Sequence, residues 1–204
     1  MLSQLVLATG NPGKRREFDR LLAPLGVTVL DQGSLGVDPA PEPYGTFLEN
    51  ALTKARHACL KTGLPALADD SGICVPALAG APGVYSARYA NPIAGLTQDQ
   101  ANNQKLVASL NGVADRQAMY VAILVLVLSP DDPLLIVAQG TWMGQVIDHP
   151  RGEHGFGYDP YFLLPELGLT AAELSATHKN EISHRAQAMQ TLINTLRERA
   201  LIRQ

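Results

Sequence analysis

Cysteine is scarce in this sequence: Cys59 and Cys74 are the only two, and they are not spaced as a C-x-x-C pair. Thiolate metal sites and redox motifs depend on closely spaced cysteines, so both classes of site are disfavoured. Each cysteine has apolar neighbours in sequence, which favours reduced thiols packed in the interior. Such cysteine usage is typical of a cytoplasmic protein.

Charged residues are also few. They make up 17% of the chain against 46% hydrophobic residues, which is typical of a globular protein without a long disordered segment. The net charge is −3, whereas proteins that bind nucleic-acid polymers usually carry a basic excess. We therefore expect no nucleic-acid polymer as a partner, although a small anion needs only a local basic cluster.

Long hydrophobic runs are missing as well. The longest, 119–128, is too short to cross a bilayer as a helix and is better interpreted as a central strand. Residues 1–8 contain no basic stretch leading into a long apolar segment, so we expect neither a signal peptide nor a membrane partner. The length of 204 residues predicts a single domain, residues 1–204, with at most an additional lobe.

Hydrophobic periodicity predicts an α/β fold with a mixed β-sheet flanked by helices. Helices separate the first strands, whereas two later strands follow each other directly across a turn at 129–133, which a purely parallel sheet would not allow. Capping patterns mark helix starts at Thr46, Thr97 and Ser183. The predicted strands are 5–8, 27–30, the apolar run before Asp69, 118–128, 134–139 and 142–147.

The apolar run that begins at Leu64 ends in two acids, a hydroxyl and a glycine: Asp69, Asp70, Ser71 and Gly72. This pattern predicts a strand that delivers acids to a loop at its carboxyl end, where ligand sites of α/β proteins collect. Because side chains alternate along a strand, the two acids should point in different directions. The alternative is an Asx-type turn in which Gly72 supplies a positive φ.

A second candidate site is the loop between the first strand and the first helix, Thr9-Gly10-Asn11-Pro12-Gly13-Lys14. It offers a hydroxyl, an amide, glycines for close backbone approach and a lysine at the start of a helix, all of which suit a phosphate. It is not a P-loop, because its glycines and lysine are too closely spaced. A tight turn with a helix cap is the alternative interpretation.

Glu42 is the only acid in a proline-rich loop, 38–45. Mg²⁺ is usually held by one or two carboxylates together with waters and substrate phosphates, so Glu42 with Asp70 would suffice. The alternative for Glu42 is simple solvent exposure. Zinc binding by His149 and His154 is disfavoured, because no further ligand completes a set.

The irregular segment 148–161 is interpreted as a binding loop. Its sequence Phe156-Gly157-Tyr158-Asp159 places two aromatics around a glycine, a composition typical either of base stacking or of core packing. Lys179, His184 and Arg185 surround the start of the last helix, where cations oppose the macrodipole, which indicates a role toward a ligand. A surface charge pair with Glu181 is the alternative.

Taken together, these motifs resemble the inosine/xanthosine triphosphate pyrophosphatase family, and the resemblance covers nearly the whole chain. Such blocks in the family's order are far more specific than any one of them alone. The blocks are Ala8-Thr9-Gly10-Asn11-Pro12-Gly13-Lys14, Thr46-Phe47-Leu48-Glu49-Asn50-Ala51, Ala68-Asp69-Asp70-Ser71-Gly72, Gly80-Ala81-Pro82-Gly83-Val84-Tyr85-Ser86-Ala87-Arg88-Tyr89, Gly155-Phe156-Gly157-Tyr158-Asp159-Pro160 and Ile182-Ser183-His184-Arg185.

The resemblance implies Mg²⁺-dependent hydrolysis of ITP, dITP and XTP to the monophosphate and pyrophosphate by a homodimer. It also implies an elongated mixed sheet in two lobes with a central cleft. Asp70 would accept a proton and share the metal with Glu42, and Ser71 would contact substrate. The 9–14 loop would hold the triphosphate, while 156–159 with Lys179, His184 and Arg185 would shape the base pocket.

One departure from the family pattern concerns the metal. Members often have two adjacent acids before the Thr-Phe helix, whereas here Pro41 precedes a single Glu42, so Asp69 is a substitute second ligand. Two competing functions remain open. One is a related pyrophosphatase acting on TTP and UTP, whose first loop resembles S-x-S-P-R-R, and the other is a nucleotide sensor without turnover.

Overall fold

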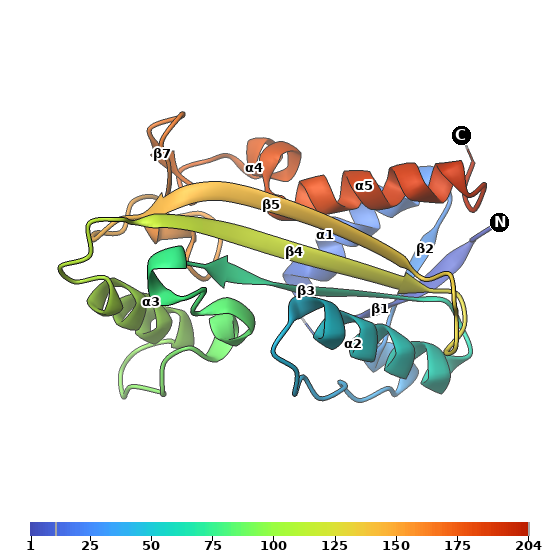
Figure 1. Cartoon of the computed structure of the whole chain (residues 1–204). Helices are drawn as coiled ribbons and strands as arrows, with labels where there is room; N and C mark the ends of the chain where they lie inside the picture. The colour runs from blue at the N-terminus through green and yellow to red at the C-terminus, as the bar shows by residue number, and fades with distance from the viewer. Residues whose placement is uncertain (11, 204) are drawn as a thin grey trace. The chain divides into compact units, whose positions relative to one another are not determined.

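The computed structural model describes residues 1–10 and 12–203 of the chain (Figure 1). Seven strands within these residues form one sheet in the order β2-β1-β3-β4-β5-β6-β7. Strand β1 pairs in parallel with β2 and β3, whereas β6 pairs antiparallel with β5 and β7, so the predicted mixed sheet is confirmed. The strands are β1 (Gln4–Ala8), β2 (Thr28–Asp31), β3 (Ala66–Cys74), β4 (Gln117–Val127), β5 (Ile136–Val146), β6 (Phe162–Leu164) and β7 (Leu169–Thr170).

The described residues divide into two compact units. Unit 1 comprises Met1–Asp70, Ile123–Gln139 and Ala188–Gln204, and unit 2 comprises Ser71–Ala122 and Gly140–Gln187. Both ends of the described chain lie in unit 1, where the Leu2 N–H donates to the Leu201 carbonyl at 2.6 Å. The single domain and the central cleft stay predictions.

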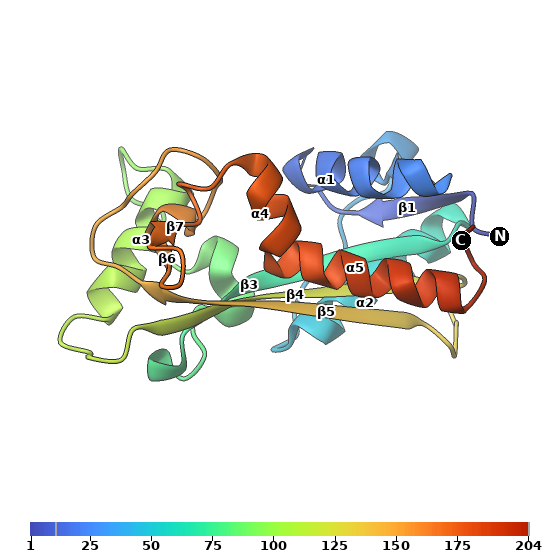
Figure 2. The same cartoon turned by 90° about the horizontal axis from the view of Figure 1, so that it is seen from above.

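Helices flank the sheet as predicted. In unit 1, α2 covers one face of the strands, whereas α1 and the part of α5 in this unit cover the other (Figures 1 and 2). None of the helices in the described residues has the length and apolarity needed to cross a membrane. The helices are α1 (Pro12–Leu22), α2 (Phe47–Thr62), α3 (Gln98–Ser109), α4 (Ala176–Ile182) and α5 (His184–Glu198).

The predicted helix caps are confirmed. The Thr46 hydroxyl accepts from the Glu49 N–H at 3.2 Å at the start of α2, and Gly63 ends this helix with a φ of 68°. At the start of α3, Thr97 and Gln100 form a reciprocal capping box. The residues between Val37 and Gly45 have no regular secondary structure, and this loop is held by hydrogen bonds from side chains of α2.

The acidic segment lies inside a strand, which corrects the prediction of a loop or turn. Strand β3 continues through Asp69, Asp70 and Ser71 to Cys74. Gly72 does not have a positive φ; it is required for space, since a Cβ there would lie 2.5 Å from the Gly83 carbonyl oxygen and would also clash with the Ser86 hydroxyl. The Ser86 hydroxyl accepts the Ile73 N–H at 2.9 Å, which ties β3 to the turn beside it.

The prediction of separate strands at 134–139 and 142–147 is also wrong, because β5 runs unbroken from Ile136 to Val146. Gly140 and Gly144 lie within it, and the close approach of Phe162 and Leu163 to Gly144 leaves no room for a side chain. The predicted turn between β4 and β5 is confirmed: the Asp132 carboxylate accepts from the N–H groups of Leu128 and Leu134 at 2.9 and 2.8 Å.

Candidate active site

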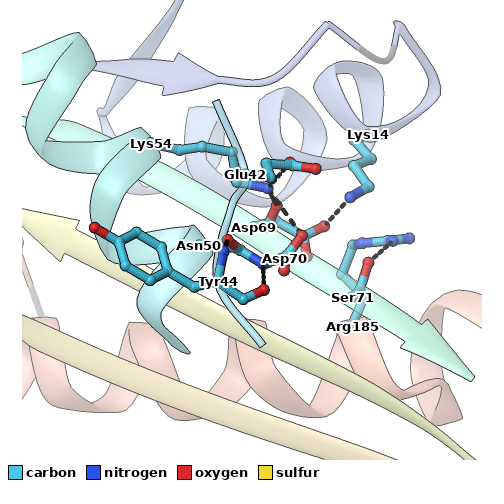
Figure 3. A network of polar contacts seen from close by, with 9 residues as sticks. All are labelled: Lys14, Glu42, Tyr44, Asn50, Lys54, Asp69, Asp70, Ser71 and Arg185. Atoms are coloured by element: carbon cyan, nitrogen blue, oxygen red, sulfur yellow. Dashed lines mark hydrogen bonds and ion pairs between the residues drawn. The ribbon is translucent and has the colours of Figure 1, made fainter. Parts of the chain in front are cut away.

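The two acids of β3 point in different directions, as strand alternation predicts. The Asp69 carboxylate pairs with Lys14 of α1 at 3.1 Å, and the Asp70 carboxylate pairs with Lys54 of α2 at 3.0 Å. Since α1 and α2 cover opposite faces of the unit 1 strands, each acid meets a cation from its own side (Figures 1 and 3). Both carboxylates are buried.

Lys54 is the centre of the polar network in Figure 3. Its ammonium lies 2.8 Å from Glu42 Oε1 and 3.0 Å from Asp70 Oδ1, and it also donates to the Asp69 carbonyl at 2.9 Å. Glu42 of the proline-rich loop and Asp70 of β3 therefore converge on a single cationic group.

The electrostatics of this network favour a proton-accepting role for Asp70. Burial raises the pKa of the Asp70 carboxyl, and the Lys54 ammonium offsets this only in part, while Glu42 adds to the rise. Burial alone would lower the pKa of Lys54, but Asp70 and Glu42 outweigh it, so that pKa is raised and the lysine stays charged. A carboxylate whose proton affinity is increased by burial is better suited to act as a general base.

The residues around Asp70 fit a divalent cation held by few protein ligands. Asp70 Oδ2 is buried and has no hydrogen-bond partner among the described residues, and Asp70 Oδ1 and Glu42 Oε1 already converge on one cation. No group of three or more His, Cys, Asp or Glu side chains in the described part of the chain has metal-binding geometry. Mg²⁺ needs only one or two carboxylates besides water and phosphate.

The first loop is shorter than predicted, because α1 begins at Pro12, so that Gly13 and Lys14 lie in its first turn. Thr9 and Gly10 line a pocket of 330 Å³ together with Arg15, Gln32 and other residues of unit 1. Asn11, which the sequence also predicts as a substrate contact, lies outside the described residues.

In unit 2, Asp159 organises the predicted base-pocket residues. It is 3% exposed, forms an ion pair with Lys179, and accepts the Phe156 N–H at 2.8 Å and the Tyr120 hydroxyl at 3.3 Å. Burial first, and then Asp159, raises the pKa of Tyr120, so its hydroxyl stays protonated and donates. A surface charge pair with Glu181 therefore does not explain Lys179, because its ammonium pairs with the buried Asp159.

The start of α5 is buried although it carries two basic residues. The His184 ring stacks on Tyr120 with centroids 4.7 Å apart and 9° between the planes. Arg185 donates to the Ser71 hydroxyl at 3.3 Å. Ser71 and Arg185, which the sequence predicts as substrate contacts, are therefore brought together within unit 2.

The two aromatics of the 156–159 motif have different environments. Phe156 is 55% exposed, and the Lys179 ammonium lies 5.2 Å from its ring centroid. Tyr158 belongs to the core of unit 2 and donates its hydroxyl to the Ser86 carbonyl at 2.7 Å. Only Phe156 therefore has a ring face available for stacking, whereas core packing accounts for Tyr158.

Helix α3 holds this motif by its backbone. The Gly157 N–H donates to Asp99 Oδ2 and its carbonyl accepts from Asn103 Nδ2, both at 2.8 Å. A pocket of 450 Å³ lies here, lined by residues of α3 and of the 150–161 segment, including Phe156 and His154.

Asn50 and Lys54 of this network are not predicted as site residues by the sequence motifs. Asn50 and Lys54 lie one helical turn apart on α2, beside the buried Ala51 and Ala55. Apolar periodicity alone assigns this face to packing. A polar pair at i, i+4 along such a face is the signal that would have revealed them, because a buried polar side chain requires partners.

A sequence model described as the Ham1 family matches residues 5–195. A dITP/XTP pyrophosphatase of Ralstonia nicotianae is 61% identical over 196 residues, covering 96% of this chain and 98% of that protein. A dITP/XTP pyrophosphatase of Neisseria meningitidis serogroup B is 57% identical over 195 residues, covering 95% of this chain and 96% of that protein.

Solved structures agree. A HAM1 protein from Coxiella burnetii superposes with a TM-score of 0.90 at 43% identity, covering 97% of this chain and all of that one (100%). A nucleoside-triphosphatase / dITP/XTP pyrophosphatase from Mycobacterium abscessus gives a TM-score of 0.74 at 38% identity, covering 93% and 98%. The predicted resemblance and enzyme class, a nucleoside triphosphate pyrophosphatase, are confirmed. The chain belongs to the Ham1 family.

Proposed function

We propose that the protein hydrolyses the nonstandard purine nucleotides ITP, dITP and XTP to the monophosphate and pyrophosphate in a Mg²⁺-dependent reaction, and so cleanses the nucleotide pool. Relatives from Ralstonia nicotianae and Neisseria meningitidis are named for dITP and XTP. The observation that carries the proposal is the buried Asp70 carboxylate, which faces Glu42 across the Lys54 ammonium and keeps one oxygen without a partner among the described residues.

In this mechanism Asp70 accepts a proton from the water that attacks the α-phosphorus, and pyrophosphate leaves. The raised pKa of Asp70 increases its affinity for that proton. Residues Thr9 to Lys14 would hold the triphosphate, and Lys14 and Lys54 would supply positive charge near it.

Glu42 and Asp70 are the residues that would hold Mg²⁺. The bound ion would offset negative charge on the triphosphate and polarise its phosphoryl oxygens. Asp69 is a less suitable ligand, because its carboxylate pairs with Lys14 of α1. Glu42 shares its partner, Lys54 of α2, with Asp70.

Base recognition is assigned to unit 2. The exposed ring of Phe156 offers a stacking surface, and Lys179, His184 and Arg185 supply donors for the 6-oxo group of hypoxanthine or xanthine. Adenine has an amino group at this position and would leave buried donors unpaired, a mismatch that discriminates strongly.

The test is pyrophosphate release from ITP, XTP, dITP, GTP, ATP and TTP, measured with Mg²⁺ and after its removal by a chelator. We expect ITP, XTP and dITP to exceed the others by orders of magnitude, with activity lost on chelation. Faster turnover of TTP than of ITP would contradict the substrate class, and tight binding without release would indicate a sensor.

We further propose a cytoplasmic homodimer. Light scattering of the purified chain measures its mass in solution. A monomer mass of 21.8 kDa at assay concentrations would contradict the dimer.

A further inference from the structure

Asn50 is an almost fully buried polar residue of α2, with 1% of its surface exposed. Its side-chain amide makes two hydrogen bonds to the backbone of one residue: Oδ1 accepts the Tyr44 N–H at 3.0 Å, and Nδ2 donates to the Tyr44 carbonyl at 3.1 Å. Figure 3 shows this closed pair directly beside the carboxylate network. An amide is suited to the task, because it presents a donor and an acceptor side by side.

The residue so held lies two positions after Glu42 in a loop without regular secondary structure. Tyr44 is 43% exposed, so the hydrogen bonds of its backbone to Asn50, rather than burial of its side chain, hold this residue. At the other end of the loop, the Asp38 carbonyl lies 3.0 Å from His57 Nε2, also on α2. Glu42 thus lies between two loop residues, Asp38 and Tyr44, whose backbones both contact side chains of α2.

The same helix carries the cation that Glu42 meets. Asn50, Lys54 and His57 follow one another at helical spacings of four and three, so they lie on one face of α2. Asn50, which holds the loop backbone, lies one helical turn before Lys54 on α2. The Lys54 ammonium in turn lies 2.8 Å from Glu42 Oε1. The spacing of Glu42 and Asp70 therefore depends on a helix face rather than on the loop itself.

We propose that Asn50 is a positioning residue for the metal-binding carboxylate of Glu42, acting through the backbone of Tyr44. The inference rests on the proposed function, in which Glu42 and Asp70 share a divalent cation. Asn50 does not touch the substrate or the metal; it reduces the number of positions that the Glu42 carboxylate samples. Groups that orient metal ligands in this way typically change metal affinity by about 10- to 100-fold when removed.

The test uses Asn50→Leu, which keeps the side-chain size but removes both hydrogen bonds, and Asn50→Ser, which is polar but too short to reach Tyr44. Binding of Mn²⁺, as a spectroscopic substitute for Mg²⁺, is titrated on the nucleotide-free protein, and the Mg²⁺ concentration for half-maximal activity is measured separately. We expect both variants to bind metal about 10-fold or more weakly. kcat should be largely restored at saturating Mg²⁺.

Thr46→Ala is the matched control. It removes the N-cap of the same helix and should cost about 1 kcal/mol of stability, but it leaves the Asn50 amide and Tyr44 intact. We expect a lower Tm with unchanged metal affinity. An equal loss of metal affinity in Thr46→Ala would show that Asn50 acts only by stabilising α2, and would overturn the inference.

Glu42→Gln separates this inference from the proposed function. If Asn50 acts through Glu42, Asn50→Leu should weaken metal binding in the wild type but add little in the Glu42→Gln background. Wild-type metal affinity in both Asn50 variants, or an undiminished loss in the double variant, would overturn the positioning role alone. Unchanged metal affinity in Glu42→Gln by itself would overturn the ligand assignment and the inference with it.

Discussion

The buried Asp70 carboxylate affects the stability of the protein as well as the proposed reaction. Because burial raises its pKa, the native state binds the Asp70 proton more tightly than the unfolded chain does. Stability from this group is therefore greatest at low pH and is lost as pH rises through the folded-state pKa. Above that pKa the carboxylate is ionised, as the proposed mechanism requires, and this contribution to stability is absent.

Asp70→Asn should therefore separate activity from stability. We expect turnover to fall by about 10²- to 10⁴-fold, the usual contribution of a general base. We expect Tm at neutral pH to be unchanged or higher, with the advantage shrinking as pH falls through the folded-state pKa of Asp70. Calorimetry over a pH series measures this; a clearly lower Tm at neutral pH, or near-normal turnover, would contradict the assignment.

Lys54 lowers the pKa of Asp70, and so the pH above which Asp70 could act as the proposed base. Lys54→Met removes the group that most lowers the Asp70 pKa, leaving burial and Glu42 to raise it further. We expect the acid limb of kcat/KM to move to higher pH, because the base must be ionised. Lys54→Arg keeps the charge and serves as the control, and an unshifted limb in Lys54→Met would show that Asp70 does not titrate in that limb.

At the scale of the element, β3 matters because it carries its acids inside the strand. Asp and Gly are poor strand formers, so the local sequence favours ending the strand before Asp69. The structure continues it because Lys14, Lys54 and Arg185 from distant segments contact Asp69, Asp70 and Ser71 in turn. No local pattern reports such contacts.

Features that depend on neighbouring residues alone are correctly predicted from the sequence. The caps at Thr46 and Thr97 and the opposed directions of Asp69 and Asp70 follow from hydrogen bonding and strand geometry within a few residues. Asn50 and Lys54 were missed, because their partners are a loop backbone and two carboxylates from other segments.

Gly72 is the position where β3 tolerates no side chain. Gly72→Ala would place a Cβ against the Gly83 carbonyl, which is backbone and cannot move aside. We expect a loss of about 1–3 kcal/mol in the free energy of unfolding, as for other overpacked sites. Gly10→Ala is the control for denaturant unfolding, since a Cβ there meets nothing within 4 Å; equal stability of the two variants would contradict the steric role.

At the scale of the whole molecule, the chain passes between the two units four times, after Asp70, Ala122, Gln139 and Gln187. Three passages lie inside β3, β4 and β5, and the fourth lies inside α5. Each unit therefore contains part of an element whose remainder belongs to the other. Neither unit is a continuous piece of chain that could form its elements alone.

We expect the units to unfold in one cooperative transition. Trp142, the only tryptophan, lies in the core of unit 2 and reports on that unit by fluorescence, whereas circular dichroism reports on helices of both. Denaturation curves from the two probes should coincide. Separated midpoints would contradict this expectation and the prediction of a single domain.

The position of these passages also limits how relatives can exchange parts. A crossover after any of the four residues joins two parental sequences in the middle of a strand or helix, where hydrogen-bond ladders and packing from both parents must match. A crossover in the turn at 129–133 between β4 and β5 should disturb the structure less, because the hydrogen bonds of this turn are made locally by Asp132. In a library of chimeras between relatives, functional recombinants should therefore be enriched for crossovers in that turn and depleted for crossovers at the unit boundaries.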